Sequence, residues 1–403
     1  MSLDILKLAA QIHSANPEFQ SHGTATRTKL PYALSQIESA DPASLEAKRR
    51  DSARTLTWMT ASIPQELKGR FAAPPVPSVY SVVGVDGSHA DTDRNMPVRC
   101  YLINIGLCGI TYGENPTAHL ENTPYLFTRE EDMQFGNPDL PMETTPMDST
   151  MIGLKRSIME LEATISWIEQ YDDAAPVVGL LDGTLIYWTL MSSDLQASAR
   201  DHVIQQQLLP LLDRVQQLST SRNIALASYI SLPMAKDVIN MLRVGECPFD
   251  TANCGTYCKE RIPGTRACDS VDGLLDREVF QVYLQTFERS STYYSTSAVS
   301  TQHYKDHRVA FFYLHAGQEV ARVEIPGWIA EDREKVDLIH SVLVEQIRKG
   351  QGYPVSLSEA HEQAVIRTSD RDTFQMLIRN SFQDISSRTM ESQKQRAKRT
   401  RWI

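Results

Sequence analysis

Short apolar runs rich in β-branched residues alternate with amphipathic segments along this chain. An apolar run of four to eight residues is typical of a buried strand, whereas apolar residues recurring every three or four positions indicate a helix. The predicted strands span 79–85, 97–112 (bent near Gly106), 177–181, 224–230, 309–314 and 319–325. The last two flank the Ala316-Gly317 turn and are expected to pair. This alternation predicts an α/β fold.

The helical segments follow from the same periodicity. Between the second and third predicted strands, an apolar stripe at helical spacing predicts a helix over 151–170. The stripe consists of Leu154, Ile158, Leu161, Ile165 and Ile168. Other helices are predicted at 44–67, 234–242, 330–349, 357–365 and 370–380. The polar stretch 113–149 has few strand signals and is expected to be a long connection.

These elements divide the chain into three expected parts. A helical N-terminal region covers 1–75 and ends in the proline-rich connector 72–77. The main domain covers 76–385 and carries a cysteine-rich insertion at 245–270. A basic tail at 386–403 either contacts an anionic surface such as a DNA backbone or is simply solvated.

Bulk composition limits the function only loosely. The 403 residues are 41% hydrophobic and 22% charged, as in an ordinary globular protein, and the net charge is −10. That charge argues against a protein that coats nucleic acid, but it suits an enzyme that gathers acids around metal ions. No apolar run approaches the roughly 20 residues of a membrane span, and the N-terminus lacks a secretory pattern. We therefore expect a cytoplasmic protein, in which its six cysteines form no structural disulfides.

Two aspartates follow predicted buried strands in matching contexts. Asp86 lies in VDGS and Asp182 in LDGT, and each is followed by glycine and a hydroxyl residue. Two such carboxylates on neighbouring strands form a hard oxygen site suited to Mg²⁺ or Mn²⁺. The competing interpretation is that both Asp-Gly pairs are ordinary turns.

The helix predicted between these aspartates supplies a third acid. Glu160 and Glu162 flank its apolar stripe on opposite sides, so periodicity does not choose between them. The order strand-Asp, strand, helix-Glu, strand-Asp and terminal helix is that of the ribonuclease H-like fold. In such a site two metal ions hold the scissile phosphate and generate the attacking hydroxide.

Longer motifs resemble the NurA family of DNA nucleases from about residue 79 to 380. The matching segments are VVGVDGS (82–88), RSIMELE (156–162), LLDGTLI (180–186), ERSS (288–291), FFYLHAGQEVARVEIPGWI (311–329) and GQGYPVSLSEAHEQAVI (350–366). The last is the most discriminating, because its Gly-Tyr-Pro and Ala-His elements are chemically unusual in combination. The resemblance implies a ribonuclease H-like mixed-sheet core with additional helices.

The resemblance also implies site residues and an activity. Asp86, Glu160 (preferred to Glu162) and Asp182 match the family's metal-binding acids, and Tyr353 and His361 match its C-terminal active-site residues. His361 is expected to bind the metal or transfer a proton. The implied activity is Mn²⁺- or Mg²⁺-dependent 5′-to-3′ exonuclease and single-strand endonuclease action in DNA end processing. A homodimer that works with the hexameric ATPase HerA is implied as well.

From the residues alone, His361 can equally be an ordinary helix histidine, and Tyr353 can simply begin a helix. Arg289 is expected to contact DNA phosphate or else to form a surface ion pair. Two other function classes remain open: a non-catalytic adaptor that keeps the fold and binds DNA or the ATPase, and a metal-dependent phosphatase or transferase.

The insertion departs from the minimal archaeal NurA pattern. Cys247, Cys254, Cys258 and Cys268 have the spacing C-x6-C-x3-C-x9-C. Four cysteines so close together favour a zinc or iron–sulfur site, although the spacing is not that of a common zinc ribbon, and unligated thiols are the alternative. Cys100 and Cys108 lie in a predicted strand and are expected to be core residues.

Overall fold

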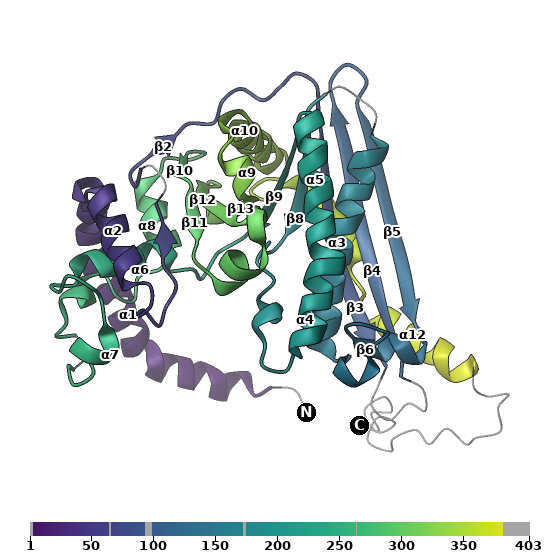
Figure 1. The fold of residues 1–403 in the computed structure, drawn as a ribbon, viewed down its shortest axis with the longest axis horizontal. Helices are drawn as coiled ribbons and strands as arrows, with labels where there is room; N and C mark the ends of the chain where they lie inside the picture. Colours follow the sequence, from purple (N-terminus) through teal and green to yellow (C-terminus); the bar gives the residue numbers. More distant parts are fainter. Residues whose placement is uncertain (1–2, 64–65, 93–98, 172–174, 263, 382–403) are drawn as a thin grey trace. The chain divides into compact units, whose positions relative to one another are not determined.

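The chain folds into two compact units. The computed structural model describes residues 3–63, 66–92, 99–171, 175–262 and 264–381 (Figure 1). Unit 1 consists of Met1–Ala73, Ile230–Thr301 and Arg308–Ala330, and unit 2 of Pro74–Tyr229, Gln302–His307 and Glu331–Ile403. The N-terminal segment therefore belongs to the same unit as the middle of the chain. The basic tail predicted at 386–403 lies outside the described residues.

Unit 1 contains short, mostly antiparallel strand pairs and several helices. Strand β12 (Val309–His315) pairs with β13 (Val320–Pro326), which confirms the expected strand pair. The remaining strands are β1 (Ala61–Ser62), β2 (Arg70–Phe71), β10 (Arg289–Ser290) and β11 (Tyr293–Ser295). The helices are α1 (Ile5–Ser39), α2 (Pro42–Ser52), α6 (Asp237–Glu246), α7 (Cys254–Tyr257), the 3-10 helix η5 (Ala267–Ser270), α8 (Asp276–Tyr283) and α9 (Gly327–Ala330).

The helix expected at 44–67 was predicted too long. It begins at Pro42 as expected, with Asp41 capping its N-terminus, but it ends at Ser52. The chain then folds back, so that Glu46 accepts a hydrogen bond from the backbone N–H of Ile63 at 3.1 Å. Residues 61–62 pair with β11 instead of continuing the helix. A distant pairing partner therefore overrides local helical propensity here.

The core of unit 1 combines aromatic packing with a buried ionic network. The rings of Phe280 and Tyr313 stack with their centroids 4.6 Å apart. Arg322 forms ion pairs with Glu324 at 2.8 Å and with Asp237 at 3.1 Å, and all three residues are buried. A buried guanidinium is tolerated here because two carboxylates neutralise it.

Unit 2 is built on a mixed five-stranded sheet. Its strands are β3 (Tyr80–Asp91), β4 (Tyr101–Tyr112), β5 (Thr117–Phe127), β8 (Val177–Asp182) and β9 (Ile224–Ile230, whose last residue belongs to unit 1). Their order is β9-β8-β3-β4-β5, with β3, β8 and β9 parallel and β4 antiparallel to both β3 and β5. The predicted α/β class is confirmed.

Strand β5 was missed by the sequence analysis, which expected a loop over 113–149. The strand extends along β4 through eleven paired positions, from Thr117 to Phe127. Almost all of its side chains are exposed or half-exposed, so it shows no alternation of apolar and polar residues. Backbone pairing at the sheet edge, and not side-chain burial, holds this strand in place.

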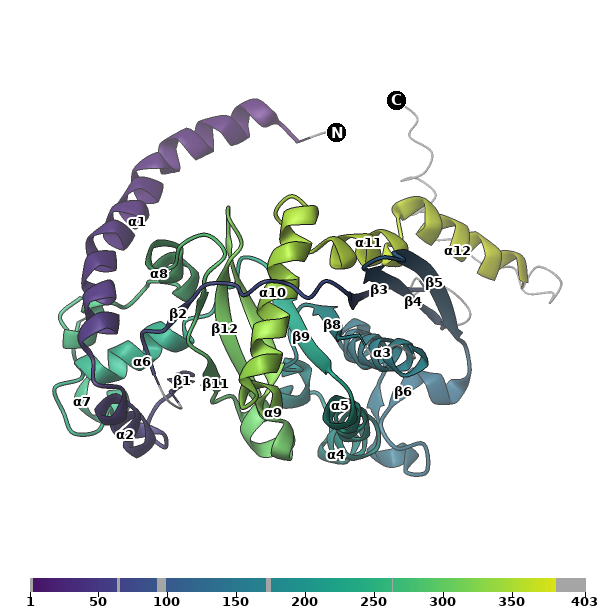
Figure 2. The same cartoon turned by 90° about the horizontal axis from the view of Figure 1, so that it is seen from above.

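Helices cover the central strands from both sides, as Figure 2 shows for α3 (Ser149–Gln170) and α11 (Val355–Ala364). Glycines permit the close approach of α11. A Cβ atom on Gly84 would lie 2.4 Å from the carbonyl oxygen of Ser356, and one on Gly106 would lie 2.3 Å from that of Ala360. Any other residue at either position would push α11 away from β3 and β4.

The other elements of unit 2 are small strands and flanking helices. They include β6 (Gln134–Phe135), β7 (Thr145–Pro146), η3 (Trp188–Met191), α4 (Ala197–Val203), the π-helix η4 (Ile204–Leu208), α5 (Leu209–Ser221), α10 (Arg333–Lys349) and α12 (Thr368–Ser381). Among the described residues, no helix is both long and apolar enough to cross a bilayer.

Candidate active site

The sheet register of unit 2 brings Asp86 and Asp182 together. Val85 pairs with Leu181 across the parallel strands β3 and β8, so the two aspartates follow at adjacent positions. Asp182 ends β8 as predicted. Asp86 does not end its strand, because β4 continues to pair with β3 as far as Asp91. Asp86 instead lies one residue beyond the last position at which β3 pairs with β8. The end of this pairing leaves room beside its carboxylate.

Helix α3 adds Glu160 to this pair. The Glu160 carboxylate lies close to the sheet. A Cβ atom on Gly87 would be 2.7 Å from Glu160 Oε1, so only glycine fits after Asp86. Glu160 is 6% exposed. Glu162 is exposed and lines a separate groove of about 640 Å³ between α3 and strands β4 and β5. Of the two glutamates that periodicity left open, the structure therefore places Glu160 with the aspartates.

Arg156, one turn before Glu160, ties the helix to the strand. Its Nη1 donates to the carbonyl oxygen of Gly87 at 2.8 Å, and its Nε lies 3.2 Å from Glu160 Oε1. The sequence analysis did not single out this arginine. Its i,i+4 spacing from Glu160 was the signal that could have identified it.

The three acids carry more negative charge than their surroundings neutralise. Burial raises the pKa of Glu160 to about 8; Arg156 opposes the shift, while the charges of Asp86 and Asp182 add to it. Desolvation and the charge of Asp86 also raise the pKa of Asp182. Glu160 Oε1 is buried and, among the described residues, accepts no hydrogen bond; its contact with Arg156 lacks hydrogen-bond geometry. The three carboxylates therefore repel one another.

The C-terminal residues expected in the site converge on the same aspartates. His361 of α11 contacts Asp86, with its Nδ1 2.8 Å from Oδ2. The Tyr353 side chain hydrogen-bonds Asp182 and thereby lowers the pKa of that carboxyl group. The Tyr353 ring also packs edge-on against Tyr229 of β9, at 5.3 Å between centroids. The five residues predicted for the site thus come from four separate segments of unit 2.

The donor set fits a divalent cation. Carboxylate oxygens and an imidazole are ligands of Mn²⁺ and Mg²⁺, and an added positive charge would relieve the repulsion that raises the pKa values of Glu160 and Asp182. As the side chains stand, no group of three or more His, Cys, Asp or Glu in the described part of the chain is already arranged around a single ion. The fit therefore rests on the chemistry of the donors and on the buried Glu160 oxygen that accepts no hydrogen bond in the described structure.

A cleft of about 390 Å³ opens beside the acids. Arg156, Glu160 and Asp182 line it, together with hydroxyl and apolar residues of α3 and of the segment at and after the end of β8. Trp188, the first residue of η3, also lines the cleft and is 45% exposed. Sequence reasoning missed Trp188, since an isolated tryptophan carries no pattern. The cleft combines acids, a guanidinium, hydroxyls and an aromatic face, which suits one nucleotide of a DNA strand.

Arg289 does not belong to this arrangement. It lies in unit 1, is 4% exposed, and its guanidinium lies over the ring of Phe71 at 4.2 Å. It is buried because the short strand β10 packs it between β2 and β12. Its guanidinium forms a cation–π interaction in this core, and the expected contact with DNA phosphate stays a prediction.

The four cysteines of the insertion meet in unit 1. All are free thiols of intermediate burial, and all line one small cavity. Burial and then the nearby thiols of Cys258, Cys268 and Cys247 raise the pKa of the Cys254 thiol. By contrast, Cys100 and Cys108 are buried in the sheet of unit 2, as expected for core residues.

Comparison with known proteins identifies a family, and the similar solved structures include a distant one. The family model described as the NurA domain matches residues 80–366. A solved structure described as "Crystal structure of NurA with manganese" is similar with a TM-score of 0.35 and 11% identity, over 89% of this chain and 97% of that chain. No curated protein sequence matches this chain.

Proposed function

Because this chain belongs to the NurA family, a family of nucleases, we propose that it cleaves DNA in a reaction that depends on Mn²⁺ or Mg²⁺. The observation that carries the proposal is the convergence of Asp86, Glu160 and Asp182 beside a cleft of nucleotide size. The strand order β5-β4-β3-β8-β9 supports a ribonuclease H-like core. The domain limits 76–385 belong to the same proposal.

The three carboxylates, with His361, would hold the metal. When bound, a divalent ion polarises the scissile phosphate and lowers the pKa of water, which supplies a nucleophile at neutral pH. Tyr353 orients Asp182 through its hydrogen bond. Arg156 fixes α3 against β3 through the Gly87 carbonyl and faces the cleft, where its guanidinium offsets phosphate charge.

His361 is placed to move a proton. When its Nδ1 donates to Asp86, the opposite ring nitrogen, Nε2, is an acceptor on a side chain that is 58% exposed. When Nε2 does not bind the metal, it can accept a proton from water and return it to the leaving oxygen. The carboxylate of Asp86 stabilises the imidazolium in between.

Digestion of end-labelled single-stranded and duplex DNA, with and without Mn²⁺, tests the function. We expect cleavage with the metal and none with a chelator. Binding without cleavage under both conditions would identify an adaptor. Release of phosphate from small phosphoesters, with DNA left intact, would identify a phosphatase.

Trp188 is proposed to stack on a base of the bound strand. Stacking on an aromatic side chain contributes roughly 1–3 kcal/mol per base, so Trp188→Ala should weaken single-strand binding by roughly 5- to 100-fold. Fluorescence anisotropy with a labelled oligonucleotide, in Ca²⁺ to suppress cleavage, measures the change. Trp188→Phe is the control and should keep most of the affinity. Equal affinities of the alanine variant and the wild-type protein would exclude this role.

The family resemblance supports proposals about polarity and partners. These are 5′-to-3′ exonuclease and single-strand endonuclease action in DNA end processing, a homodimer, and a HerA-type hexameric ATPase as partner. A chain of net charge −10 attracts DNA weakly, so a ring motor that delivers duplex would raise the local substrate concentration. Size-exclusion chromatography with a HerA-type ATPase should give a complex that needs ATP to degrade duplex. Separate elution and ATP-independent rates would refute the partnership.

A further inference from the structure

Four thiols from three segments of unit 1 line one cavity of about 20 Å³. Cys247 follows α6, Cys254 and Cys258 lie at the two ends of α7, and Cys268 lies in η5. Folding thus brings four cysteines with irregular sequence spacing to one location. Among residues that the structure describes, these thiols form no disulfide. These thiols belong to unit 1, whereas the carboxylates of the proposed nuclease site belong to unit 2.

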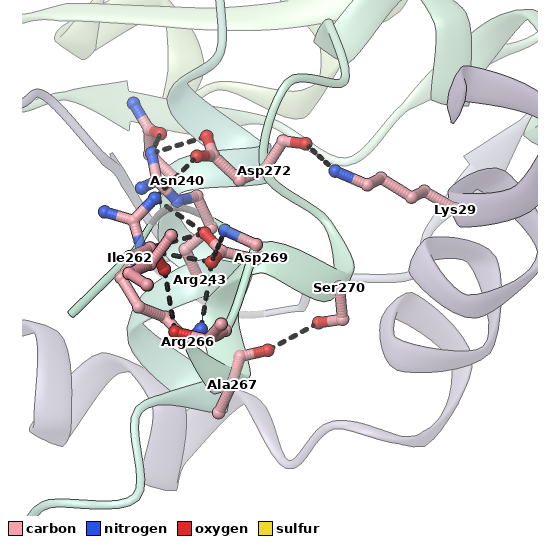
Figure 3. A network of polar contacts seen from close by, with 11 residues as sticks. Lys29, Asn240, Arg243, Ile262, Arg266, Ala267, Asp269, Ser270 and Asp272 are labelled. Atoms are coloured by element: carbon pink, nitrogen blue, oxygen red, sulfur yellow. Dashed lines mark hydrogen bonds and ion pairs between the residues drawn. The ribbon is translucent and has the colours of Figure 1, made fainter. Parts of the chain in front are cut away.

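Polar contacts hold the backbone around this cavity independently of the thiols (Figure 3). Asp269 accepts hydrogen bonds from the backbone N–H groups of Gly264 at 2.7 Å and Arg266 at 2.9 Å. Asp272 pairs with Arg243 at 3.1 Å, and its carbonyl accepts from Lys29 Nζ at 2.6 Å. The loop that carries Cys268 is therefore tied to α6 and to α1. The frame is ordered before any ligand is added.

Basic and aromatic side chains complete the cavity wall. Arg243, Arg261 and Arg266 line it, and the Arg243 guanidinium both hydrogen-bonds the Cys268 thiol and lies over Trp58 at 4.6 Å. The Nε of Arg243 is buried without a hydrogen-bond partner in the described structure. A centre bound by four thiolates is an anion whose sulfurs accept hydrogen bonds. These arginines offset that charge, and Arg243 Nε has a donor to offer it.

Aromatic rings also limit the access of water. Phe249 and Tyr257 stack with centroids 4.0 Å apart, and both line the cavity beside the thiols. An apolar wall of this kind protects a metal–sulfur centre from hydrolysis and oxidation. The wall and the arginines together make a built site, in contrast to a chance cluster of cysteines.

The arrangement of the thiols selects the ligand. In a zinc site, four bonds of about 2.3 Å draw all the sulfurs around one ion. Within the described residues, these thiols do not converge on a point where a single ion could bind. A cubane cluster holds the same four thiols farther apart, because each binds a different iron. We propose that Cys247, Cys254, Cys258 and Cys268 bind a [4Fe–4S] cluster.

The decisive measurement is the metal content of the wild-type full-length chain, purified without oxygen and without chelators. We expect about four iron and about four acid-labile sulfide ions per chain, with broad visible absorption that dithionite bleaches. A chain purified without cluster should acquire this content on anaerobic incubation with ferrous iron and sulfide. Stoichiometric zinc without iron, about two irons per chain, or no uptake on incubation would each overturn the proposal.

Cysteine variants locate the centre. Cys254→Ser and Cys268→Ser should lose at least half of the iron and the visible absorption, whereas Cys108→Ala, a buried thiol in unit 2, should retain both. Unchanged iron in the two serine variants would overturn the assignment of ligands. If those variants fail to fold, the wild-type iron and sulfide content still decides the matter. The readout is independent of nuclease activity, so its failure and that of the proposed function are distinguishable.

Discussion

Asp182→Asn and Asp86→Asn are each expected to lower DNA cleavage by more than about 100-fold, the scale on which loss of one charge-stabilising group impairs an active site. Each change keeps the shape of the side chain but removes a charge that the metal needs. Asp86 has a second role, because its Oδ2 lies 2.8 Å from His361 Nδ1. Cleavage of labelled single-stranded DNA in Mn²⁺, at matched protein concentration, measures the effect.

The matched control is Asp91→Asn. Asp91 lies on the same strand as Asp86 but is exposed at its far end, so this variant should cleave at the wild-type rate. Mn²⁺ should also raise the melting temperature of the wild-type protein and the control more than that of Asp182→Asn, because binding to the folded state stabilises it. Wild-type cleavage by either active-site variant would show that the two aspartates are not metal ligands.

Glu160→Gln is expected to abolish cleavage and, in metal-free protein, to stabilise unit 2. The Glu160 carboxyl group has an ordinary pKa of 4.5 when the chain is unfolded and about 8 when it is folded. Between these values the folded state retains a proton that the unfolded state has released. The stability of the wild-type protein therefore falls as pH rises from about 5 to about 8. Glutamine has no proton to release, so the variant does not show this loss of stability as pH rises.

Chemical denaturation in the presence of a chelator tests the effect at pH 5 and pH 8. The variant should gain on the order of 2 kcal/mol over the wild-type protein between these pH values. This is less than the full pKa shift implies, because relaxation and water penetration reduce the effective penalty of a buried charge. Glu162→Gln, two residues away and exposed, should show neither effect. A stability difference that is the same at both pH values would exclude a buried, repelled carboxylate at position 160.

Local sequence patterns already predicted most of the strands and helices that carry the site residues. Strands 177–181 and 224–230 and helix 151–170 agree with β8, β9 and α3 to within two residues at each end. Their signals are local, because a buried strand is a short apolar run and an amphipathic helix repeats every three to four residues. The VDGS and LDGT motifs likewise identified Asp86 and Asp182 before any fold was known. Strand β5 is held by backbone pairing with β4 and buries no side chains, so its sequence carries no such signal.

Tertiary structure decided which side chains share an environment. Periodicity placed Glu160 and Glu162 equally beside the apolar stripe, and only the packing of α3 over Gly87 separates them. Arg289 is polar in sequence, yet β10 carries it into a core between aromatic rings. The cysteines have an irregular spacing and meet only because the loop after α6 is tied back by Asp269 and Asp272. Burial and electrostatic neighbours depend on contacts between segments far apart in sequence, and no local pattern encodes those contacts.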